Sequence, residues 1–468
     1  MSGFFGSISK QDCVPDVFYG TDYHSHLGTK RAGMAVYHQK NEFQQAIHSL
    51  EDGYFRNKFA GSFKEFRGNS GIGVISDTEA QPMVVSSHLG TFAVATVSKI
   101  ANLDELEARF LKKHQHFTET SQGTVNATEL ISMLISEGTD FVSGIENVYA
   151  HVKGSCTMLI LTANEILAAR DKLGRHPIII GKRDGAFAIA SETSSFANLG
   201  YTIEYYLGPG EIVRVTSEGY EQLKKPGDKM QICSFLWVYY GYPPAYYEGI
   251  NVEACRYRCG ACLGKRDNVE VDLVSGIPDS GVAHGLGYAN ERHLPYQRPY
   301  IKYTPTWPRS FMPQKQELRD LVAKMKLIPN PALIGGKRAV FLDDSIVRGT
   351  QLKDNVRDLY EAGAKEIHMR IACPPLTYPC EFLNFSRSRA TSDLASRKAI
   401  LKLEGTEDVN LKAYSDSGTE EYASMVEQIR KDLGFTSLKY QKLDDLVEAI
   451  GLPKEKLCTH CWDGSSYF

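Results

Sequence analysis

The sequence lacks three features that would each place it in a broad class. It contains no run of about 20 apolar residues, and its first residues have neither the basic start nor the apolar stretch of a signal peptide. Its charge is balanced, with 53 Lys and Arg against 56 Asp and Glu and no block of like charge, which argues against a nucleic-acid-binding protein. We therefore expect a cytoplasmic protein that binds neither membrane nor nucleic acid, with small molecules or other subunits as partners.

Cysteine is also scarce, with 10 residues in a chain of 468. That number is too small for a disulfide framework in a cytoplasmic protein and large enough for a metal site. At roughly 100–200 residues per domain, the length predicts two to four folded domains. The chain contains no internal repeat and no low-complexity segment.

The two halves of the chain differ in texture. The first half carries short apolar segments separated by Gly, Asp and Asn, which is typical of antiparallel strands with helices packed on them. After about residue 251, single buried strands alternate with helix-length segments, which predicts a parallel α/β sheet with right-handed crossovers. We expect domains at 1–230 and 231–468. The predicted strands are 33–37, 157–162, 177–181 and 186–190 in the first half, and 269–278, 338–344 and 366–372 in the second.

The most informative motif is Ala339-Val-Phe-Leu-Asp-Asp-Ser-Ile-Val-Arg-Gly-Thr350, a buried strand followed by two acids, a small-residue loop and helical sequence. Such a loop presents backbone N–H groups and the positive end of a helix macrodipole to a phosphate. Ser345 and Thr350 add hydroxyl groups, and Gly349 allows the backbone to approach an anion closely. Asp343 and Asp344 are placed to bind ribose hydroxyls or Mg²⁺. The alternative is that two acids after a strand only begin a helix.

This motif resembles the 5-phosphoribosyl pyrophosphate (PRPP) motif of type I phosphoribosyltransferases, in the form found in the amidophosphoribosyltransferase family. The resemblance extends over nearly the whole chain: 249–264 resembles the family helix that enters the transferase domain, 275–289 its pyrophosphate loop, and 302–311 the loop that closes over PRPP. It implies an α/β and α+β protein, with an N-terminal Ntn-hydrolase-like αββα sandwich and a C-terminal type I phosphoribosyltransferase domain. The implied PRPP-binding residues are Asp279, Ser280, Lys302, Arg309, Lys326, Asp343, Asp344, Ser345, Val347, Arg348, Gly349 and Thr350, with Asp343 and Asp344 also binding Mg²⁺.

The chain departs from the family pattern in both of these loops. The family's Mg²⁺-contacting serine falls at Gly281, next to Ser280, and the middle of the closing loop differs from the usual Asn-Arg-Tyr-Val-Gly. The implied reaction is displacement of pyrophosphate from C1 of the ribose by ammonia. Such a reaction needs a neutralised leaving group and exclusion of water rather than covalent help from the protein.

The N-terminal half departs further. The family begins with a nucleophilic cysteine exposed by removal of Met1, whereas Ser2 stands here, and a hydroxyl is far less ionised than a thiol near neutral pH. The expected glutamine-binding and oxyanion-hole groups are also missing, so we predict a glutaminase-like domain without glutaminase activity. The family's two arginines fall at Leu27 and Ser76, its Asn-Gly at Val97-Ser98, and its substrate-binding aspartate at Ala127.

Near its end the chain carries Cys458-Thr-His-Cys461, a spacing that leaves zinc, an iron–sulfur cluster and chance open. In the branch of the family that carries a 4Fe–4S cluster, cysteines also occupy the positions of Cys233 and Cys380, so the resemblance implies a cluster at these four residues. A rival set, Cys255, Cys259 and Cys262, has the C-x₃-C-x₂-C spacing of radical S-adenosylmethionine enzymes, but the same spacing also fits one face of a helix. We interpret Cys13, Cys156 and Cys373 as core residues.

Three hypotheses follow. The first is a PRPP-dependent amidotransferase that uses free ammonia, or ammonia from a separate glutaminase, in purine biosynthesis. The second is a pseudo-enzyme that binds PRPP or nucleotides and regulates an active homologue, and the third is an enzyme that attacks PRPP with another nucleophile. The first also implies purine nucleotide effectors and a homo-oligomer, as a dimer or tetramer.

Overall fold

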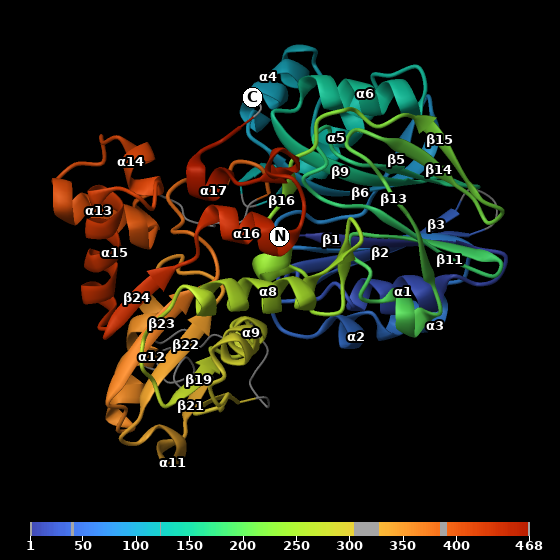
Figure 1. The fold of residues 1–468 in the computed structure, drawn as a ribbon. Coiled ribbons are helices and arrows are strands. Elements are labelled where there is room, and N and C mark those ends of the chain that lie inside the picture. The colour runs from blue at the N-terminus through green and yellow to red at the C-terminus, as the bar shows by residue number, and fades with distance from the viewer. Residues whose placement is uncertain (1, 39–41, 122, 304–326, 384–390, 467–468) are drawn as a thin grey trace.

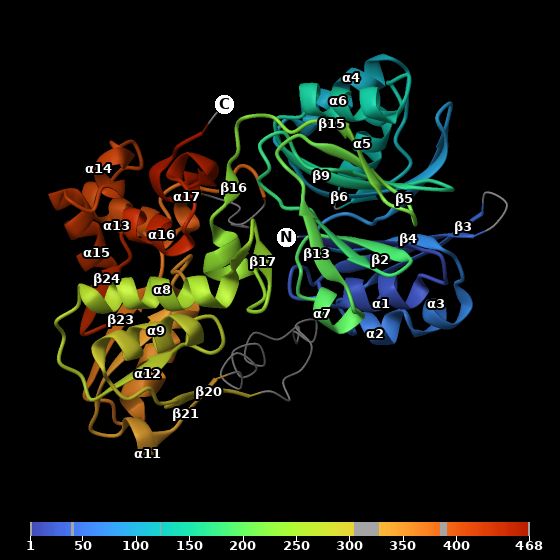
Figure 2. The same ribbon diagram turned by 45° about the vertical axis from the view of Figure 1, so that its right-hand side comes forward.

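The structure is a computed structural model that describes residues 2–38, 42–121, 123–303, 327–383 and 391–466. The chain forms two halves that Figure 2 separates: the strands from β1 to β15, apart from the small β7-β8 pair, build a two-sheet sandwich, and a parallel sheet with its helices forms the other half. No helix in these ranges has the length and hydrophobicity that crossing a bilayer requires.

The first sheet of the sandwich is antiparallel and seven-stranded, in the order β13-β11-β12-β1-β4-β2-β3. Strand β1 lies in its centre between β12 and β4, so the start of the chain is held on both sides by hydrogen-bonded neighbours. Every residue of β12 is buried, because a second sheet covers one face and helices cover the other. The strands are Gly3–Ser9 (β1), Arg31–His38 (β2), Glu42–Ser49 (β3), Ser70–Ser76 (β4), Ile179–Arg183 (β11), Ala186–Ala190 (β12) and Thr202–Tyr206 (β13).

The second sheet has six antiparallel strands in the order β15-β14-β10-β9-β6-β5. Apolar side chains from both sheets, including Phe4, Ile72 and Leu159, form the core between them. The strands are Met83–Ser87 (β5), Gly90–Ile100 (β6), Gly154–Leu161 (β9), Ile166–Ala169 (β10), Ile212–Val215 (β14) and Tyr220–Lys224 (β15).

Helices cover the two outer faces of the sandwich, which completes the expected αββα layering (Figure 1). Three helices pack on the seven-stranded sheet: Val14–Asp22 (α1), Phe55–Lys58 (α2) and Ala60–Glu65 (α3). Three others pack on the six-stranded sheet: Leu103–Lys112 (α4), Ala127–Ile135 (α5) and Phe141–His151 (α6). The smaller elements of this half are Thr120–Ser121 (β7), Thr124–Val125 (β8) and Phe196–Leu199 (α7).

The other half is built on a four-stranded parallel sheet in the order β19-β22-β23-β24, as the alternating pattern predicts. Its strands are Leu273–Gly276 (β19), Arg338–Asp343 (β22), Glu366–Ile371 (β23) and Ser437–Tyr440 (β24). Helices Val252–Lys265 (α8), Val282–Arg292 (α9) and Thr350–Glu361 (α12) pack around it. The predicted strand 269–278 is wrong in extent, because the Arg292 guanidinium and not a neighbouring strand binds the carbonyl of Val269.

The remaining elements connect and cap this half. A π-helix, Leu236–Tyr240 (η1), and the hairpin Tyr246–Tyr247 (β17) and Ile250–Asn251 (β18) lead from the sandwich into α8. The others are Ile232–Cys233 (β16), Tyr300–Lys302 (β20), Leu327–Pro329 (β21), Pro331–Ile334 (α11), Thr391–Asp393 (η2), Ala395–Glu404 (α13), Leu411–Ser415 (α14), Glu420–Leu433 (α15), Leu443–Ile450 (α16), Lys454–Lys456 (η3), Leu457–Cys458 (β25) and His460–Asp463 (α17).

Candidate functional site

The loop predicted to bind phosphate lies between β22 and α12, where the sequence motif places it. The strand residues Ala339 to Leu342 are fully buried, so Asp343 emerges at the carboxyl edge of the parallel sheet. Gly349 precedes α12 with a positive φ of 76°, a conformation that glycine adopts at little cost. The backbone N–H groups at the start of α12 therefore face the carboxyl edge, where ligands of open α/β sheets bind.

The two acids at this edge are buried and close together. Ser280 donates a hydrogen bond of 2.8 Å to Asp343, the backbone N–H of Asp344 donates one of 2.9 Å to the same oxygen, and Ser345 donates one of 2.5 Å to Asp344. Burial raises the pKa of both carboxyl groups, and the Asp344 charge raises that of Asp343 further. Two crowded carboxylates are a donor set that fits Mg²⁺, which would relieve their repulsion.

The expected pyrophosphate loop lies beside this motif. Gly276 at the end of β19 is the register partner of Leu342 in β22, and the Ile277 N–H donates a 2.8 Å hydrogen bond to the Leu342 carbonyl. A Cβ added to Gly281 would lie 1.9 Å from the same carbonyl oxygen. The close approach of the two loops therefore requires glycine at this position, and Ser280 supplies the hydroxyl that contacts Asp343.

The structure describes only some of the remaining residues that are predicted to bind PRPP. Lys302 forms a 2.5 Å ion pair with Asp279 at the mouth of the site, and Arg348 lies 3.8 Å from Asp393. Val347 packs against the core beneath the loop. Arg309 and Lys326 lie outside the described residues.

The N-terminal site forms around Ser2, which is buried at the start of β1. Its hydroxyl donates a 3.3 Å hydrogen bond to Ser76, at the position of an expected arginine. Ser76 also accepts 3.2 Å hydrogen bonds from the backbone N–H groups of Thr78 and Glu79. Burial raises the pKa of the neighbouring Glu79 carboxyl. Where the resemblance places a cation for a substrate carboxylate, the chain thus has a hydroxyl and an acid.

Three other positions that differ from the family pattern carry apolar side chains. Leu27 and Val97 are buried among apolar side chains, and Ala127 offers no polar group. Gln81 instead bonds within the protein: its side-chain oxygen accepts 2.7 Å and 3.2 Å hydrogen bonds from the Thr96 N–H and the Thr128 hydroxyl. The polar groups of Gln81 and Thr128 are therefore bound within the protein.

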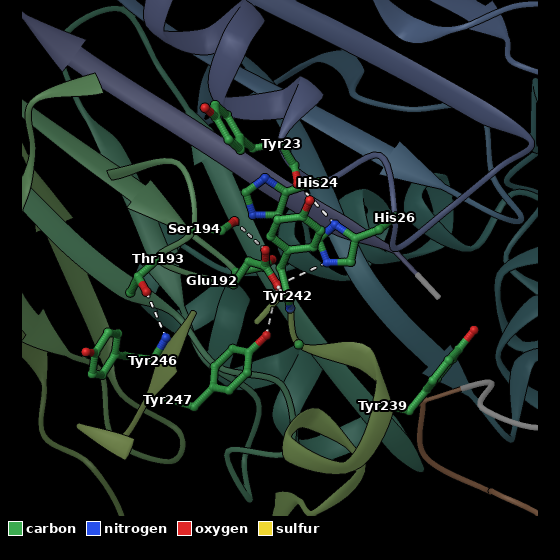
Figure 3. Close-up of polar contacts among 12 residues, drawn as sticks. Tyr23, His24, His26, Glu192, Thr193, Ser194, Tyr239, Tyr242, Tyr246 and Tyr247 are labelled. Carbon is green, nitrogen blue, oxygen red and sulfur yellow. Dashed lines mark hydrogen bonds and ion pairs between the residues drawn. The ribbon is translucent and has the colours of Figure 1, made fainter. Parts of the chain in front are cut away.

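A polar cluster that the sequence does not reveal joins the two halves (Figure 3). Glu192, just after β12, is fully buried and accepts hydrogen bonds from His26 at 3.1 Å, the Tyr247 hydroxyl at 2.9 Å and the Tyr242 N–H at 3.3 Å. Burial opposes ionisation of Glu192, but the charge and hydrogen bond of His26, together with a hydrogen bond from Ser194, lower its pKa to about 2. The pair shifts the pKa of His26 as well. Burial alone would lower this pKa, but the Glu192 carboxylate raises it. Nothing in the local sequence around Glu192 indicates these partners.

The four cysteines of the expected cluster converge at the junction of the halves. Cys233 and Cys458 are register partners in the parallel pair β16 and β25, and a hydrogen bond to Cys380, together with burial, raises the pKa of Cys461. Arg175 lies near Cys458, where burial raises the thiol pKa and the guanidinium opposes that rise. Thiol donors brought together in this way fit an iron–sulfur cluster in kind. Within the described residues, however, no group of three or more His, Cys, Asp or Glu side chains is arranged to hold a metal ion.

The rival cysteines lie along α8, as the helical interpretation predicts. Cys259 donates its S–H to the Ala372 carbonyl and is buried with Cys255, whereas Cys262 is partly exposed. Burial raises the pKa of Cys255 to about 12. Cys13, Cys156 and Cys373 are buried, as expected of core residues.

Fold and site together define a two-domain protein in which a glutamine-amidotransferase sandwich of the Ntn type is joined to a phosphoribosyltransferase sheet. Residues 70–198 match the family model described as a glutamine amidotransferase domain. The chain is 30% identical to an amidophosphoribosyltransferase of Methanocaldococcus jannaschii over 99% of this chain and 97% of that protein, and 29% identical to one of Bacillus subtilis over 96% and 89%. The solved structure of the B. subtilis glutamine PRPP amidotransferase complexed with ADP and GMP matches with a TM-score of 0.84 and 27% identity, covering 99% of this chain and 97% of that one.

The chain belongs to the amidophosphoribosyltransferase family.

Proposed function

We propose that the chain is a PRPP-dependent amidophosphoribosyltransferase of purine biosynthesis that takes ammonia rather than glutamine as its nitrogen donor. Residues 231–468 form its transferase domain, and residues 1–230 form a glutaminase-type domain without glutaminase activity. The observation that carries the proposal is the contrast between the two sites: the acid pair and both phosphate loops are assembled around Asp343 and Asp344, whereas the pocket around Ser2 lacks its cations and its thiol.

In the transferase site, the chain's own residues bind and orient the pyrophosphate and ribose. The N–H groups at the start of α12 and the hydroxyls of Ser345 and Thr350 would hold the 5-phosphate. Asp343 and Asp344 would hold Mg²⁺ and the ribose hydroxyls, and bound Mg²⁺ neutralises charge on the departing pyrophosphate. Lys302 would leave Asp279 to contact the pyrophosphate, since its present ion pair is half exposed and contributes little.

The residues around Ser2 disfavour both the binding and the hydrolysis of glutamine. A glutamine α-carboxylate would meet Glu79 and the Ser76 hydroxyl instead of a guanidinium, so its charge would be unpaired on leaving water. The oxyanion of a tetrahedral intermediate would lack the side-chain amide donor that Val97 replaces. A change at Ser2 alone therefore does not restore the activity.

We also propose that Cys233, Cys380, Cys458 and Cys461 bind a 4Fe–4S cluster that fastens the C-terminal tail to the domain junction, with four-cysteine zinc as the alternative. The convergence of four cysteines from three distant parts of the chain supports this proposal. Metal binding here would add directly to folding stability, because the unfolded chain keeps these thiols apart.

Further partners follow from the same family membership. We propose purine nucleotides as effectors, since the B. subtilis structure contains ADP and GMP. A homo-oligomer and a separate glutaminase, or an active homologue as ammonia source, complete the proposed assembly. The second candidate function, a regulatory pseudo-enzyme that binds PRPP, is favoured by Lys302 being paired with Asp279 and by the altered closing loop.

The test is pyrophosphate release from PRPP and Mg²⁺ with ammonium, glutamine or no amine. We expect release with ammonium only and no glutamate from glutamine, both for the native chain and for Ser2→Cys. Glutamate release by the native chain would overturn the proposed loss of glutaminase activity. Tight PRPP binding without pyrophosphate release from any amine would favour the pseudo-enzyme, and release with another nucleophile but not with ammonium would identify a different transferase.

A further inference from the structure

Glu192 belongs to the sandwich, but half of its hydrogen bonds come from residues 236–251. These residues form the entering segment, which leads into α8 of the transferase domain. His26 and Ser194 donate to it from its own domain, and the Tyr242 N–H and the Tyr247 hydroxyl donate from the entering segment (Figure 3). A fully buried carboxylate is tolerated only with such partners, because leaving them unmade costs the full desolvation penalty. Glu192 therefore fixes where residues 242–247 lie.

The residues just before these, 237–241, are bound by side chains of the transferase helices. Arg256 on α8 donates hydrogen bonds to the carbonyls of Trp237, Tyr239 and Gly241 at 2.8–2.9 Å. His284 on α9 contacts the Val238 carbonyl at 3.3 Å. The carbonyls of the π-helix and of the residue after it are thus bound by side chains from two helices.

Helices α8 and α9 can move only together. A Cβ on Gly260 of α8 would lie 2.0 Å from the His284 carbonyl oxygen, and one on Gly287 of α9 would lie 2.1 Å from that of Tyr257. At such distances the backbones are in direct contact, so a shift of one helix displaces the other. Helix α9 begins directly after Gly281, and the preceding Ser280 donates to Asp343.

We infer that Glu192 is a positioning residue for the pyrophosphate loop, although it lies in the domain that has lost its own chemistry. The contacts run from Glu192 through residues 242–247 and the π-helix to Arg256 and His284, and from α9 to Ser280. The identity of the bound ligand rests on the proposed function, whereas the positioning itself does not. The glutaminase-type domain is therefore retained as a support for the transferase site.

The experiment compares Glu192→Gln with Glu211→Gln in the full chain. Glutamine keeps the shape of the Glu192 side chain, but its NH2 group cannot accept hydrogen bonds from the donors that surround the carboxylate. Glu211 is the matched control: it is also fully buried, and its hydrogen bonds from Tyr205, Gly208 and Gln222 stay within the sandwich. Tyr247→Phe, which removes one donor and keeps the ring, is the second variant should Glu192→Gln fold poorly.

Hydrogen–deuterium exchange without ligand is the first measurement. We expect at least threefold faster exchange of peptides covering 236–247 and 277–285 in Glu192→Gln, and a smaller increase in Tyr247→Phe, with Glu211→Gln matching the native chain there. Unchanged exchange at 277–285 in Glu192→Gln and Tyr247→Phe, or equal acceleration in Glu211→Gln, would overturn the inference.

The second measurement is the KM for PRPP in ammonium-dependent pyrophosphate release. We expect KM to rise at least threefold in Glu192→Gln with a smaller change in kcat, and no change in Glu211→Gln. A native chain that neither binds nor turns over PRPP would overturn the proposed function, while the exchange result would still decide the positioning role. An unchanged KM beside an active native chain would overturn the inference alone.

Discussion

Gly281 has no room for the side chain that the family resemblance places there. The Leu342 carbonyl would lie 1.9 Å from its Cβ, and the Ile277 nitrogen 2.7 Å. The neighbouring Ser280 reaches the same acid pair through its 2.8 Å hydrogen bond to Asp343. A hydroxyl therefore contacts the acid pair from one residue earlier in the chain.

We expect Gly281→Ser to lower the free energy of unfolding by about 1–3 kcal/mol, because backbone must move to admit the side chain. Ser280→Ala should cost only about 1 kcal/mol, the net worth of one hydrogen bond, and should weaken Mn²⁺ binding. Urea denaturation and calorimetric titration with Mn²⁺ measure the two effects. A Gly281→Ser chain as stable as the native one would contradict the packing argument.

The His26–Glu192 pair predicts a pH dependence of stability with two limits. The pKa of Glu192 falls from 4.5 to about 2 on folding, so it contributes about 3 kcal/mol above pH 4.5, and this stabilisation is lost as the pH falls through that interval. The pKa of His26 rises on folding, so its contribution is complete below pH 6.5 and is lost as the pH rises through the folded value.

Thermal unfolding from about pH 2 to pH 9 measures this dependence. His26→Gln should flatten the alkaline limb and leave the acid limb of other carboxylates in place. His38, a partly exposed histidine bound to the Arg67 carbonyl, provides the control His38→Gln, which should leave both limbs unchanged. An alkaline limb that survives in His26→Gln would show that another group is responsible.

At the scale of elements, the pair α8 and α9 connects the entering segment with the pyrophosphate loop. Glycines on both helices allow their backbones to touch, as Gly260 does against His284. Parallel-sheet topology then places the loops after β19 and β22 side by side at one edge. The site is therefore positioned by helix packing as much as by the strands.

Gly260→Ala tests this packing. We expect a loss of about 1–3 kcal/mol and weaker PRPP binding, because the new methyl group would force the two helices apart. Gly61→Ala on α3 is the control: nothing lies within 4 Å of its Cβ, so it should be neutral or stabilise by up to about 1 kcal/mol. Denaturation midpoints and PRPP titration distinguish the two, and equal effects would refute close packing as the cause.

At the scale of the whole molecule, one apolar cluster spans both halves. Phe5 and Ile179 of the sandwich belong to the same cluster as Trp237, Phe341 and Trp462. The four converging cysteines lie in this shared region, and Lys99 of the sandwich donates to the Cys380 carbonyl. Loss of the junction should therefore affect both domains together.

We expect Cys461→Ser to abolish the brown colour and the bound iron and sulfide of anaerobically purified protein, and to lower the unfolding temperature. Cys156→Ser, a buried cysteine away from the junction, should keep the colour and the iron. Visible absorption with iron and zinc analysis measures both variants. Stoichiometric zinc in place of iron would select the alternative metal, and neither metal in the native chain would refute the site.

Much of the architecture could be predicted because it depends on local patterns. Strand 186–190 agrees with β12, and 338–344 and 366–372 overlap β22 and β23 nearly throughout. Strand 269–278 could not be bounded, because Arg292, distant in sequence, binds the backbone there. The cluster around Glu192 could not be predicted either, because its hydrogen-bond donors come from distant segments near residues 26 and 242.

Residues adjacent in the chain were enough to predict three features: the order of the two domains, the strand–loop–helix of the PRPP motif and the absence of the family's nucleophilic cysteine. Three further features emerged from the folded chain alone: position 281 requires glycine, four cysteines from three distant parts of the chain converge, and Glu192 holds the entering segment. These features depend on contacts between residues that are distant in the chain. Burial makes such contacts matter for stability, because a buried polar group without a partner is costly.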